Sequence, residues 1–229
     1  MSISFEDFIK ELNKGRLILL GELHGTKEIP EIVKQIIINL GDKLGLVFLE
    51  IPEDQQKYIN QYIMSKDEKD LFNIPFFRNP TKDGRDSKEN LLLIKCILEP
   101  INKIKIIFVD PNKIKDREYL MYRNIKEKLK SQSNLSIFLT GNVHASKEEI
   151  TINEKRISTC GYYLKKWLGK NLISVNFVAN KGSFYNLKVK QIFEKNKKEG
   201  IFRSKTKDYD FEYRLKELTP CHFLPDNPQ

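Results

Sequence analysis

Residues 16–25 read RLILLGELHG, and this stretch decides the class of fold that the chain can adopt. An unbroken apolar run that stops at Gly21 is typical of a buried strand, because glycine allows a sharp turn at its end. Further runs of this kind follow along the chain, at 44–52, 101–111, 134–144, 171–180 and 183–193. We expect the last two to pair with each other as neighbouring strands.

Amphipathic stretches of helical length separate most of these runs. They lie at 28–40, 53–64, 87–98, 113–130 and 160–168. Continuous apolar strands that alternate with helices are typical of a parallel sheet, because the crossover helices cover its faces. The sequence therefore predicts an α/β fold with a mostly parallel sheet and helices on both faces.

A length of 229 residues is compatible with a single domain, because one hydrophobic core can grow to about 250 residues before chains divide. We assign residues 1–199 to this α/β domain. Within it, residues 71–86 contain several Pro and Gly residues and are expected to form an insertion or a lid. Residues 200–229 are polar and are expected to form a C-terminal arm on the surface.

The composition limits the classes of protein to which the chain can belong. Hydrophobic residues make up 40% of the chain and charged residues 31%, which suits a folded domain with a sizeable core. No apolar run approaches the ~20 residues that cross a bilayer, and the first residues lack the pattern of a secretory signal. Cys96, Cys160 and Cys221 are isolated, which argues against a disulfide framework. These observations predict a cytoplasmic protein with no membrane span.

The formal charge of +9 raises the question of nucleic-acid binding. The basic residues are scattered, and the densest stretch, 188–207, also contains Glu194 and Glu199 and only two aromatic residues. A nucleic-acid interface should concentrate its charge on one element. We therefore expect a solvated basic face and no specific nucleic-acid site.

Acids and histidines follow the ends of four predicted strands. They are Glu22, His24, Glu50, Asp110 and His144. In open parallel sheets, ligands bind beyond the carboxyl ends of the strands, where loops and side chains converge. These residues are therefore candidates for one shared site.

The two histidines occur in matched contexts, each as the last residue of a Gly-x-x-His motif that follows an apolar run. Gly21 precedes His24 by three residues, and Gly141 precedes His144 by the same spacing. A lone histidine is more often a hydrogen-bonded or exposed side chain, but two in the same context predict a functional pair. His222, in the tail, lacks this context and is expected to have no role.

The remaining candidates are charged residues near strand and helix ends. Glu50 directly closes an apolar run and needs a partner if it is buried. Asp110 precedes Pro111, so it can either cap the next helix or belong to the site. Arg85 in DGRDS (83–87) and Arg117 near a helix start are either clamps for a carboxylate or phosphate, or surface residues.

GELHG, the strand-ending Glu50 and GNVHA together resemble the superfamily of erythromycin esterases, ChaN haem-binding lipoproteins and Tiki/TraB proteins. REYLMYRNI (117–125) also resembles the superfamily helix Arg-Asp-x-x-Met-Ala-x-Asn-Ile, with Glu118 for Asp and Tyr122 for Ala. DGRDS looks like a DGRxS element of some members. The resemblance spans residues 16–146 and implies a site formed by Glu22, His24, Glu50 and His144, with Arg117 in support.

The first functional hypothesis is a hydrolase of an ester or amide, with a small-molecule or peptide substrate. His24 would be the general base, oriented by Glu22 or Glu50. His144 would polarise the carbonyl or protonate the leaving group. No GxSxG motif is present, so attack by water is preferred over a covalent intermediate. Arg85 or Arg117 would hold an anionic part of the substrate, and Asp110 is a third candidate for substrate binding.

Two variants of this hypothesis stay open. His24, His144 and Glu50 have the chemistry of ligands for a divalent metal ion such as zinc, manganese or iron. The resemblance to ChaN also implies a non-enzymatic binder of iron or haem. A haem needs a broad apolar pocket, for which the sequence offers aromatic residues at Tyr58, Tyr62, Phe76 and Phe77.

Overall fold

The apolar stretch at 17–20 forms the first part of β2 (Leu17–Glu22), a central strand of the sheet in the computed structural model of the protein. The structure describes residues 1–78, 83–99, 103–112 and 115–225. β2 pairs in parallel with β5 (Leu135–Gly141) on one side and with β8 (Leu172–Asn186) on the other. All six residues of β2 are buried, as a strand covered on both faces requires.

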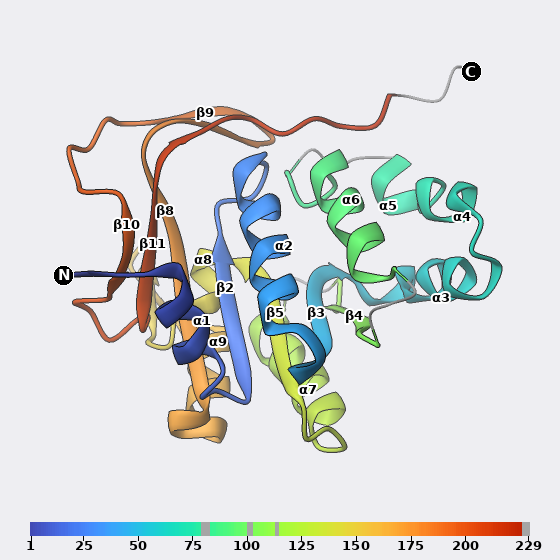
Figure 1. The fold of residues 1–229 in the computed structure, drawn as a ribbon, viewed down its shortest axis with the longest axis horizontal. Coiled ribbons are helices and arrows are strands. Elements are labelled where there is room, and N and C mark those ends of the chain that lie inside the picture. Colours follow the sequence, from blue (N-terminus) through green and yellow to red (C-terminus); the bar gives the residue numbers. More distant parts are fainter. Residues whose placement is uncertain (79–82, 100–102, 113–114, 226–229) are drawn as a thin grey trace.

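The main sheet has nine strands in the order β1-β10-β11-β8-β2-β5-β3-β4, and β9 pairs with β8 (Figure 1). The strands from β11 to β4 run parallel, so the predicted α/β fold with a mostly parallel sheet is confirmed. The other strands of the sheet are β1 (Ser2–Ile3), β3 (Leu44–Pro52), β4 (Lys105–Asp110), β9 (Lys188–Ile192), β10 (Gly200–Arg203) and β11 (Phe211–Leu218). A separate two-stranded sheet contains β6 (Ile150–Ile152) and β7 (Lys155–Ile157).

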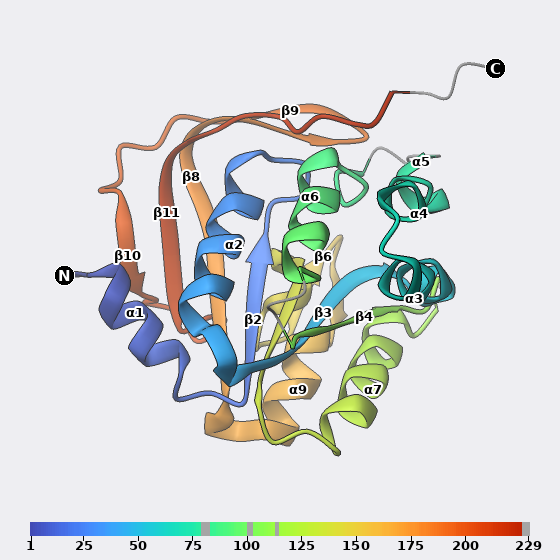
Figure 2. The same cartoon turned by 45° about the vertical axis from the view of Figure 1, so that its right-hand side comes forward.

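Helices cover both faces of the sheet (Figures 1 and 2). Successive residues of β2 point to opposite faces of the sheet. Ile18 and Leu20 belong to the hydrophobic cluster on one face, and Leu17 and Leu19 belong to the cluster on the other. The first face packs against α1 (Phe5–Leu12), α2 (Glu28–Leu40) and α6 (Lys88–Ile97). The second packs against α7 (Arg117–Leu129), α8 (Asn142–Ala145) and α9 (Cys160–Leu168).

Short helices complete the fold. They are α3 (Gln56–Ser65), α4 (Glu68–Phe72), α5 (Pro75–Arg78) and the 3-10 turns at Gly41–Lys43, Glu53–Gln55 and Gly169–Asn171. Side-chain caps set where α6 and α9 begin, since Ser87 Oγ accepts from Asn90 N (3.2 Å) and Thr159 Oγ1 accepts from Tyr162 N (3.0 Å). The start of α6 matters for the site, because DGRDS leads directly into it.

Part of the segment 71–86, expected as an insertion or lid, belongs to the core. Leu71, Phe76 and Phe77 are buried within the same hydrophobic cluster as α2 and α6. Residues 79–82 of this segment lie outside the described residues. The described part is therefore packed against the domain, because its apolar side chains gain more from burial than from exposure.

Residues 200–229 were expected to form a surface arm, and this expectation is wrong for 200–218. β11 lies between β8 and β10 in the main sheet and runs parallel to β8. In FEYRLKEL, Phe211, Tyr213 and Leu215 alternate with charged residues, and all three contact the hydrophobic core. This period of two is the signature of a strand with one buried face, which an average over a polar segment hides.

Residues 219–224, here called the C-terminal clasp, cross the carboxyl-end loops of the sheet (Figure 1). The clasp reaches the turn after β2, where Cys221 N donates to Gly25 O (3.0 Å) and Thr219 Oγ1 donates to Glu28 Oε1 (2.6 Å). It also reaches the start of α6, where Lys88 N donates to His222 O (2.8 Å). The clasp therefore ties together the two loops that carry His24 and Arg85.

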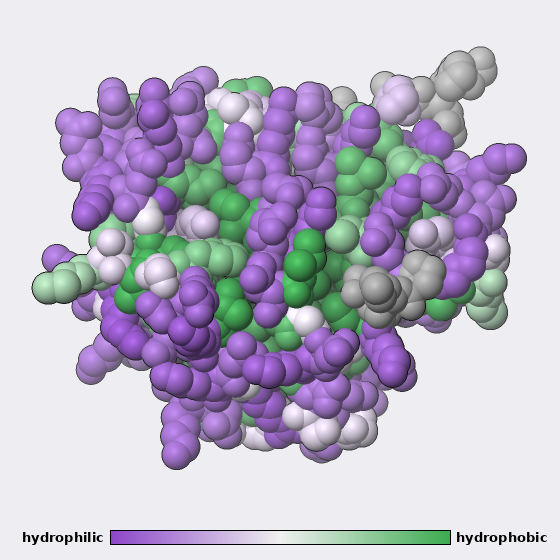
Figure 3. All heavy atoms as spheres, in the orientation of Figure 1, coloured by the Kyte–Doolittle hydropathy of each residue, from purple (hydrophilic) through white to green (hydrophobic). Residues whose placement is uncertain are grey.

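The surface carries charge over many elements. On the face covered by α1, α2 and α6, hydrophilic side chains are spread broadly, with hydrophobic patches between them (Figure 3). In the described part of the chain, none of the helices has both the length and the hydrophobicity that a bilayer crossing requires. The absence of a specific nucleic-acid site stays a prediction.

Candidate functional site

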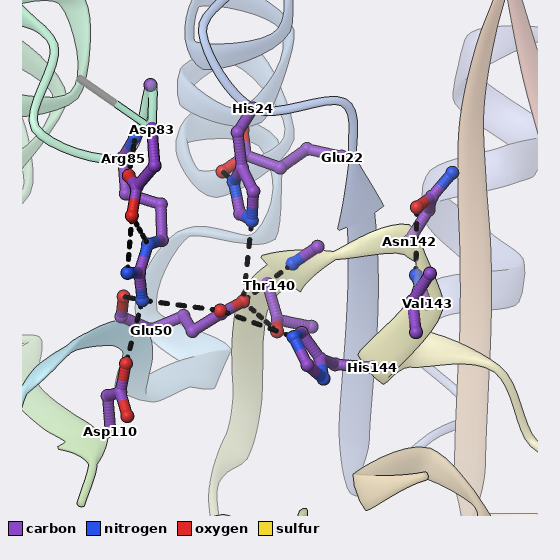
Figure 4. A network of polar contacts seen from close by, with 12 residues as sticks. Glu22, His24, Glu50, Asp83, Arg85, Asp110, Thr140, Asn142, Val143 and His144 are labelled. Carbon is purple, nitrogen blue, oxygen red and sulfur yellow. Dashed lines mark hydrogen bonds and ion pairs between the residues drawn. The ribbon is translucent and has the colours of Figure 1, made fainter. Parts of the chain in front are cut away.

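The site lies where β2, β3, β4 and β5 end at one edge of the sheet (Figure 4). His24, Glu50 and His144 meet there, as the strand-end positions predicted. His24 Nε2 is 3.6 Å from Glu50 Oε2, and His144 Nε2 is 3.4 Å from Glu50 Oε1. The two imidazoles thus face opposite oxygens of one carboxylate.

His24 is held by the turn after β2. Gly25, with a φ of +74°, makes the turn that only glycine adopts easily. His24 Nδ1 is 2.9 Å from Glu22 Oε1, two residues earlier on the strand. A Cβ on Gly141 would lie 2.8 Å from His24 Nε2, so the glycine of the second motif makes room for the first histidine.

His144 is held by the one-turn helix α8 and by α7. Its Nδ1 lies 2.6 Å from Glu118 Oε1, and its Nε2 lies 3.0 Å from Arg117 Nη1. A Cβ on Gly21 would lie 2.9 Å from the Cβ of Ala145, so the glycine of the first motif makes room for the second helix.

Glu50 is the centre of the site and is 5% exposed. Its Oε2 accepts from Thr140 Oγ1 (2.6 Å) and Gly141 N (2.8 Å), and its Oε1 accepts from Arg117 Nη2 (2.7 Å). Burial by itself raises the pKa of Glu50, but the histidines and arginines around it hold that pKa well below the ordinary value. The carboxylate is therefore ionised at neutral pH.

The two arginines are bound by carboxylates of the protein. Arg85 donates from Nε to Asp83 Oδ2 (3.0 Å) and from Nη1 to Asp110 Oδ2 (2.7 Å). Arg117 donates from Nε to Asp110 Oδ1 (3.0 Å) and from Nη2 to Asp110 Oδ2 (2.7 Å). Burial raises the pKa of Asp83 and of Asp110, but the guanidinium groups outweigh it and lower both. Asp110 thus belongs to the site, and the N-cap of α7 is Asp116.

The pKa of each histidine is raised. For His24, burial lowers the pKa, but the carboxylates of Glu22 and Glu50 outweigh this effect. Burial also lowers the pKa of His144, but the carboxylates of Glu50 and Glu118 outweigh this effect and raise it. Both imidazoles therefore bind protons more readily than a histidine in water.

An open cleft of about 290 Å³ is lined by both histidines, Glu50, Asp83, Asp110 and the two arginines, and not by Glu22 or Glu118. Asn112 and Asn186 also line it. Sequence reasoning did not assign a site role to these two residues, to Asp83, to Thr140 or to Glu118. Asp83 could have been found from its place two residues before Arg85 in DGRDS, whereas Asn186 comes from a hairpin far along the chain. His222 lies outside this cleft, and its Nδ1 is 2.7 Å from Glu89 Oε1.

The donor set does not fit a metal ion. Among the described residues, no group of three or more His, Cys, Asp or Glu side chains is arranged to hold one. Glu50, the carboxylate that His24 and His144 share, already accepts four hydrogen bonds from the protein, and Arg117 Nη2 lies 2.7 Å from its Oε1. A divalent cation bound to Glu50 would be repelled by the positive guanidinium group of Arg117. We therefore derive no step through a metal.

The aromatic residues expected to line a haem pocket belong to the hydrophobic core. Phe77 is fully buried, and Phe76 and Tyr62 are each 8% exposed. Tyr58 is partly buried and packs against the same cluster. The expectation that these side chains form an open haem pocket is therefore wrong, because they fill the space between α3, α5 and the sheet.

No family model matches the chain, and no curated protein matches it either. Solved structures with the same fold do exist. A succinoglycan biosynthesis protein is 12% identical with a TM-score of 0.75, over 96% of this chain and 93% of that chain. ChaN of Campylobacter jejuni, described with cofacial haem binding, is 17% identical with a TM-score of 0.55, over 92% and 91%. An erythromycin esterase mutant in its open conformation is 10% identical with a TM-score of 0.63, over 95% and 79%.

At such low sequence identities, the similarity to these structures establishes a shared fold and nothing further. The chain has the α/β fold that ChaN and the erythromycin esterase also have, as the two Gly-x-x-His motifs implied. One of these relatives is an esterase and the other binds haem, so the fold by itself fits either activity. The choice between them has to come from the residues of the site.

Proposed function

We propose that this protein is a hydrolase that cleaves an ester or an amide by direct attack of water. The observation that carries the proposal is the orientation of His24. Its Nδ1 lies 2.9 Å from Glu22, while its Nε2 lies beside the cleft, 3.6 Å from Glu50. A neutral ring that donates from Nδ1 to Glu22 has its lone pair on Nε2, and 3.6 Å is too long for a hydrogen bond to Glu50. That lone pair is open to a water molecule.

In the proposed step, Nε2 of His24 takes a proton from water while the water oxygen attacks the carbonyl carbon. Glu22 stabilises the imidazolium that forms. While His144 is protonated its Nε2 cannot accept a hydrogen bond, so Arg117 uses three of its five N–H groups on Asp110 and Glu50 and has those of Nη1 left for the developing oxyanion. Glu50 anchors Arg117 and stays ionised throughout.

His144 protonates the leaving group when the tetrahedral intermediate collapses. The raised pKa of His144 favours the protonated ring that a general acid needs. After the transfer, the neutral Nε2 accepts a hydrogen bond from Arg117 Nη1, which lies 3.0 Å away. For the next cycle, His24 releases to water the proton that it took, and His144 takes a proton from water.

Attack by water also agrees with the state of Cys160. This thiol is fully buried, and burial raises its pKa well above the ordinary value, as does the neighbouring Glu118. A thiol in that state is a poor nucleophile. The substrate in this proposal is a small molecule or a peptide, and a cytoplasmic location stays a prediction from composition.

A screen of ester and amide substrates tests the proposal, with His24→Ala and His222→Ala measured beside the wild type. We expect turnover by the wild type and by His222→Ala, and loss of turnover in His24→Ala. Equal turnover by all three proteins would contradict the proposal. A haem absorption band that appears on adding haem and is lost in His24→Ala would favour the binding function instead.

A further inference from the structure

The hairpin of β8 and β9 carries several exposed apolar side chains close together. Leu187 at its turn is 68% exposed, Val189 on β9 is 49% exposed, and Phe193 directly after β9 is 86% exposed. Apolar residues that are exposed singly are common on protein surfaces and need no explanation. Three of them within one short stretch of one hairpin are typical of a binding surface instead.

Lysines lie between and after these apolar residues. Residues 187–198, here called the β9 surface, contain five lysines and one glutamate, so their formal charge is +4. The lysines are Lys188, Lys190, Lys195, Lys197 and Lys198, and all of them are exposed. In the described part of the chain, no ion pair joins any of these five to a carboxylate, whereas Lys181 on β8 lies 3.5 Å from Glu217. Their charge is therefore available to a partner.

The backbone holds the β9 surface in place. β9 lies along the outer edge of the molecule (Figures 1 and 2), and its partner in the described sheet is β8. Beyond β9, Lys195 N donates to Asn180 O (2.8 Å), and Asn180 Nδ2 donates to Lys197 O (2.6 Å). Ile192 packs against the hydrophobic core. Because the backbone is already ordered, a partner has to order only side chains when it binds.

The mixture of lysines and apolar side chains suits a partner that is negatively charged at its surface and apolar just beneath it. A single-stranded nucleic acid would pair with the lysines but would also need aromatic rings for its bases, and Phe193 is the sole aromatic residue of the β9 surface. Lysine stems can extend so that the charges stay with lipid headgroups while Phe193 and Leu187 enter the acyl boundary. We propose that the β9 surface docks on a membrane that contains anionic lipids.

Docking goes beyond the proposed hydrolase, because membrane binding requires no turnover. The hairpin also reaches the candidate site. Asn186, at the tip of the hairpin, lines the cleft, and Tyr185 N donates to Gly25 O (2.9 Å) in the turn that follows His24. A protein docked through the β9 surface therefore has the cleft close to the lipid headgroups.

Sedimentation with vesicles tests the apolar part of the surface. One vesicle preparation contains equal amounts of phosphatidylserine and phosphatidylcholine, and the other contains phosphatidylcholine alone. We expect binding to the first and not to the second, and weaker binding as salt rises. Phe193→Ser should lower the affinity at least about fivefold, because an apolar side chain no longer leaves water. Met64→Ser on α3 is the matched control, since Met64 is 80% exposed, and it should bind like the wild type.

The position of the charge is tested with two double variants. One replaces Lys197 and Lys198 by glutamate, and the other replaces Lys43 and Lys128, which are exposed on other elements. Both variants change the net charge by the same amount. We expect the first to lower the affinity for anionic vesicles at least about tenfold and the second to lower it much less, because charges act near the membrane surface. Equal losses would overturn the inference.

Fluorescence locates the contact. The chain has one tryptophan, Trp167 on α9, so Phe193→Trp and Met64→Trp each add a second one. Brominated lipids should quench the added fluorescence of Phe193→Trp and not that of Met64→Trp. Absence of vesicle binding by the wild type would overturn the inference. Tighter binding to poly(U) RNA than to anionic vesicles, with no loss in Phe193→Ser, would also overturn it and would indicate a nucleic-acid surface. Neither result bears on the hydrolase, which is measured with substrates in solution.

Discussion

The two Gly-x-x-His motifs have the same spacing in the sequence but different structures. In the first, the chain turns at Gly25, and Glu22 of the same strand orients His24. In the second, the chain enters the short helix α8, and the partner of His144 comes from α7. Two motifs with equal spacing therefore place their imidazoles beside one carboxylate through two different backbone conformations.

The glycines show how the two motifs pack against each other. Gly141 leaves room for His24, and Gly21 leaves room for Ala145 beside α8. Because β2 and β5 are neighbours in register, with Glu22 opposite Gly141, each glycine lies under the other motif. The motifs are thus complementary parts of one packing arrangement, and breaking either one should affect both.

The largest difference between the two motifs should appear when the histidines are removed. We expect His24→Ala to reduce kcat by roughly 100-fold to 10,000-fold, because the base is lost. His144→Ala should cost less for substrates with good leaving groups, which need no proton. Steady-state kinetics with a series of leaving groups checks this. Equal losses for every leaving group would contradict the division into base and acid.

The glycines should separate stability from activity. In Gly21→Ala the new Cβ meets Ala145 Cβ at 2.9 Å and Asn142 Cα at 3.0 Å, so α8 has to move. We expect a loss of about 1–3 kcal/mol in the free energy of unfolding. In Gly141→Ala the contact is with the end of the His24 ring, which can swing away. That variant should keep most of its stability and lose activity, as urea unfolding and kinetics together would show.

A partial rescue would sharpen the first of these results. Adding Ala145→Gly to Gly21→Ala removes the Cβ–Cβ contact and should restore part of the stability. No gain from the second substitution would mean that the clash is not the cause.

Glu22 and Glu118, the carboxylate partners of the two histidines, should each affect a different limb of the profile of activity against pH. The base His24 must be neutral, so activity falls as pH drops through its pKa, which lies above the ordinary 6.5. The acid His144 must be protonated, so activity falls as pH rises through its own raised pKa. Because the two rings share Glu50, the limbs report the coupled pair.

Glu22→Gln removes a charge that raises the pKa of His24, so the acid limb should move to lower pH. Glu118→Gln should instead move the alkaline limb to lower pH. We expect shifts of roughly one pH unit, from kcat measured between about pH 5 and 10. Identical shifts of both limbs in both variants would show that the partners are not assigned to separate rings.

The smallest effect should come from the clasp, which holds the first motif. Thr219→Val removes the hydrogen bond from Thr219 Oγ1 to Glu28 Oε1 and should cost about 1 kcal/mol of stability. It should also loosen the turn at Gly25, seen as faster amide exchange there, with little change at His144. Thr151→Val on the exposed strand β6 is a matched control. Equal exchange in the two variants would contradict a role for the clasp in holding His24.

Much of the sheet could be predicted because its strands are buried on both faces. The helix expected at 28–40 and the strand expected at 44–52 have those bounds in the structure. β11 was missed because only every second residue faces the core. A segment with that pattern looks polar on average, although Phe211 is buried.

The site could be predicted only in part for a similar reason. Strand ends identify Glu22, Glu50 and Asp110 from local sequence, since a parallel sheet brings them to one edge. Glu118 reaches His144 from α7, and Asn186 reaches the cleft from the tip of the β8–β9 hairpin. No local pattern marks such residues, because their place depends on how distant elements pack.

The sequence by itself determined the α/β class and the meeting of two histidines with Glu50, because hydrophobic periodicity and strand ends are local properties. Only the tertiary structure decided what those residues contact. It paired Arg85 with Asp83 and both arginines with Asp110, so the two expected anion clamps are already bound by carboxylates of the protein. Charge balance in a cleft is a sum over side chains from many elements, and that sum exists only once the chain has folded.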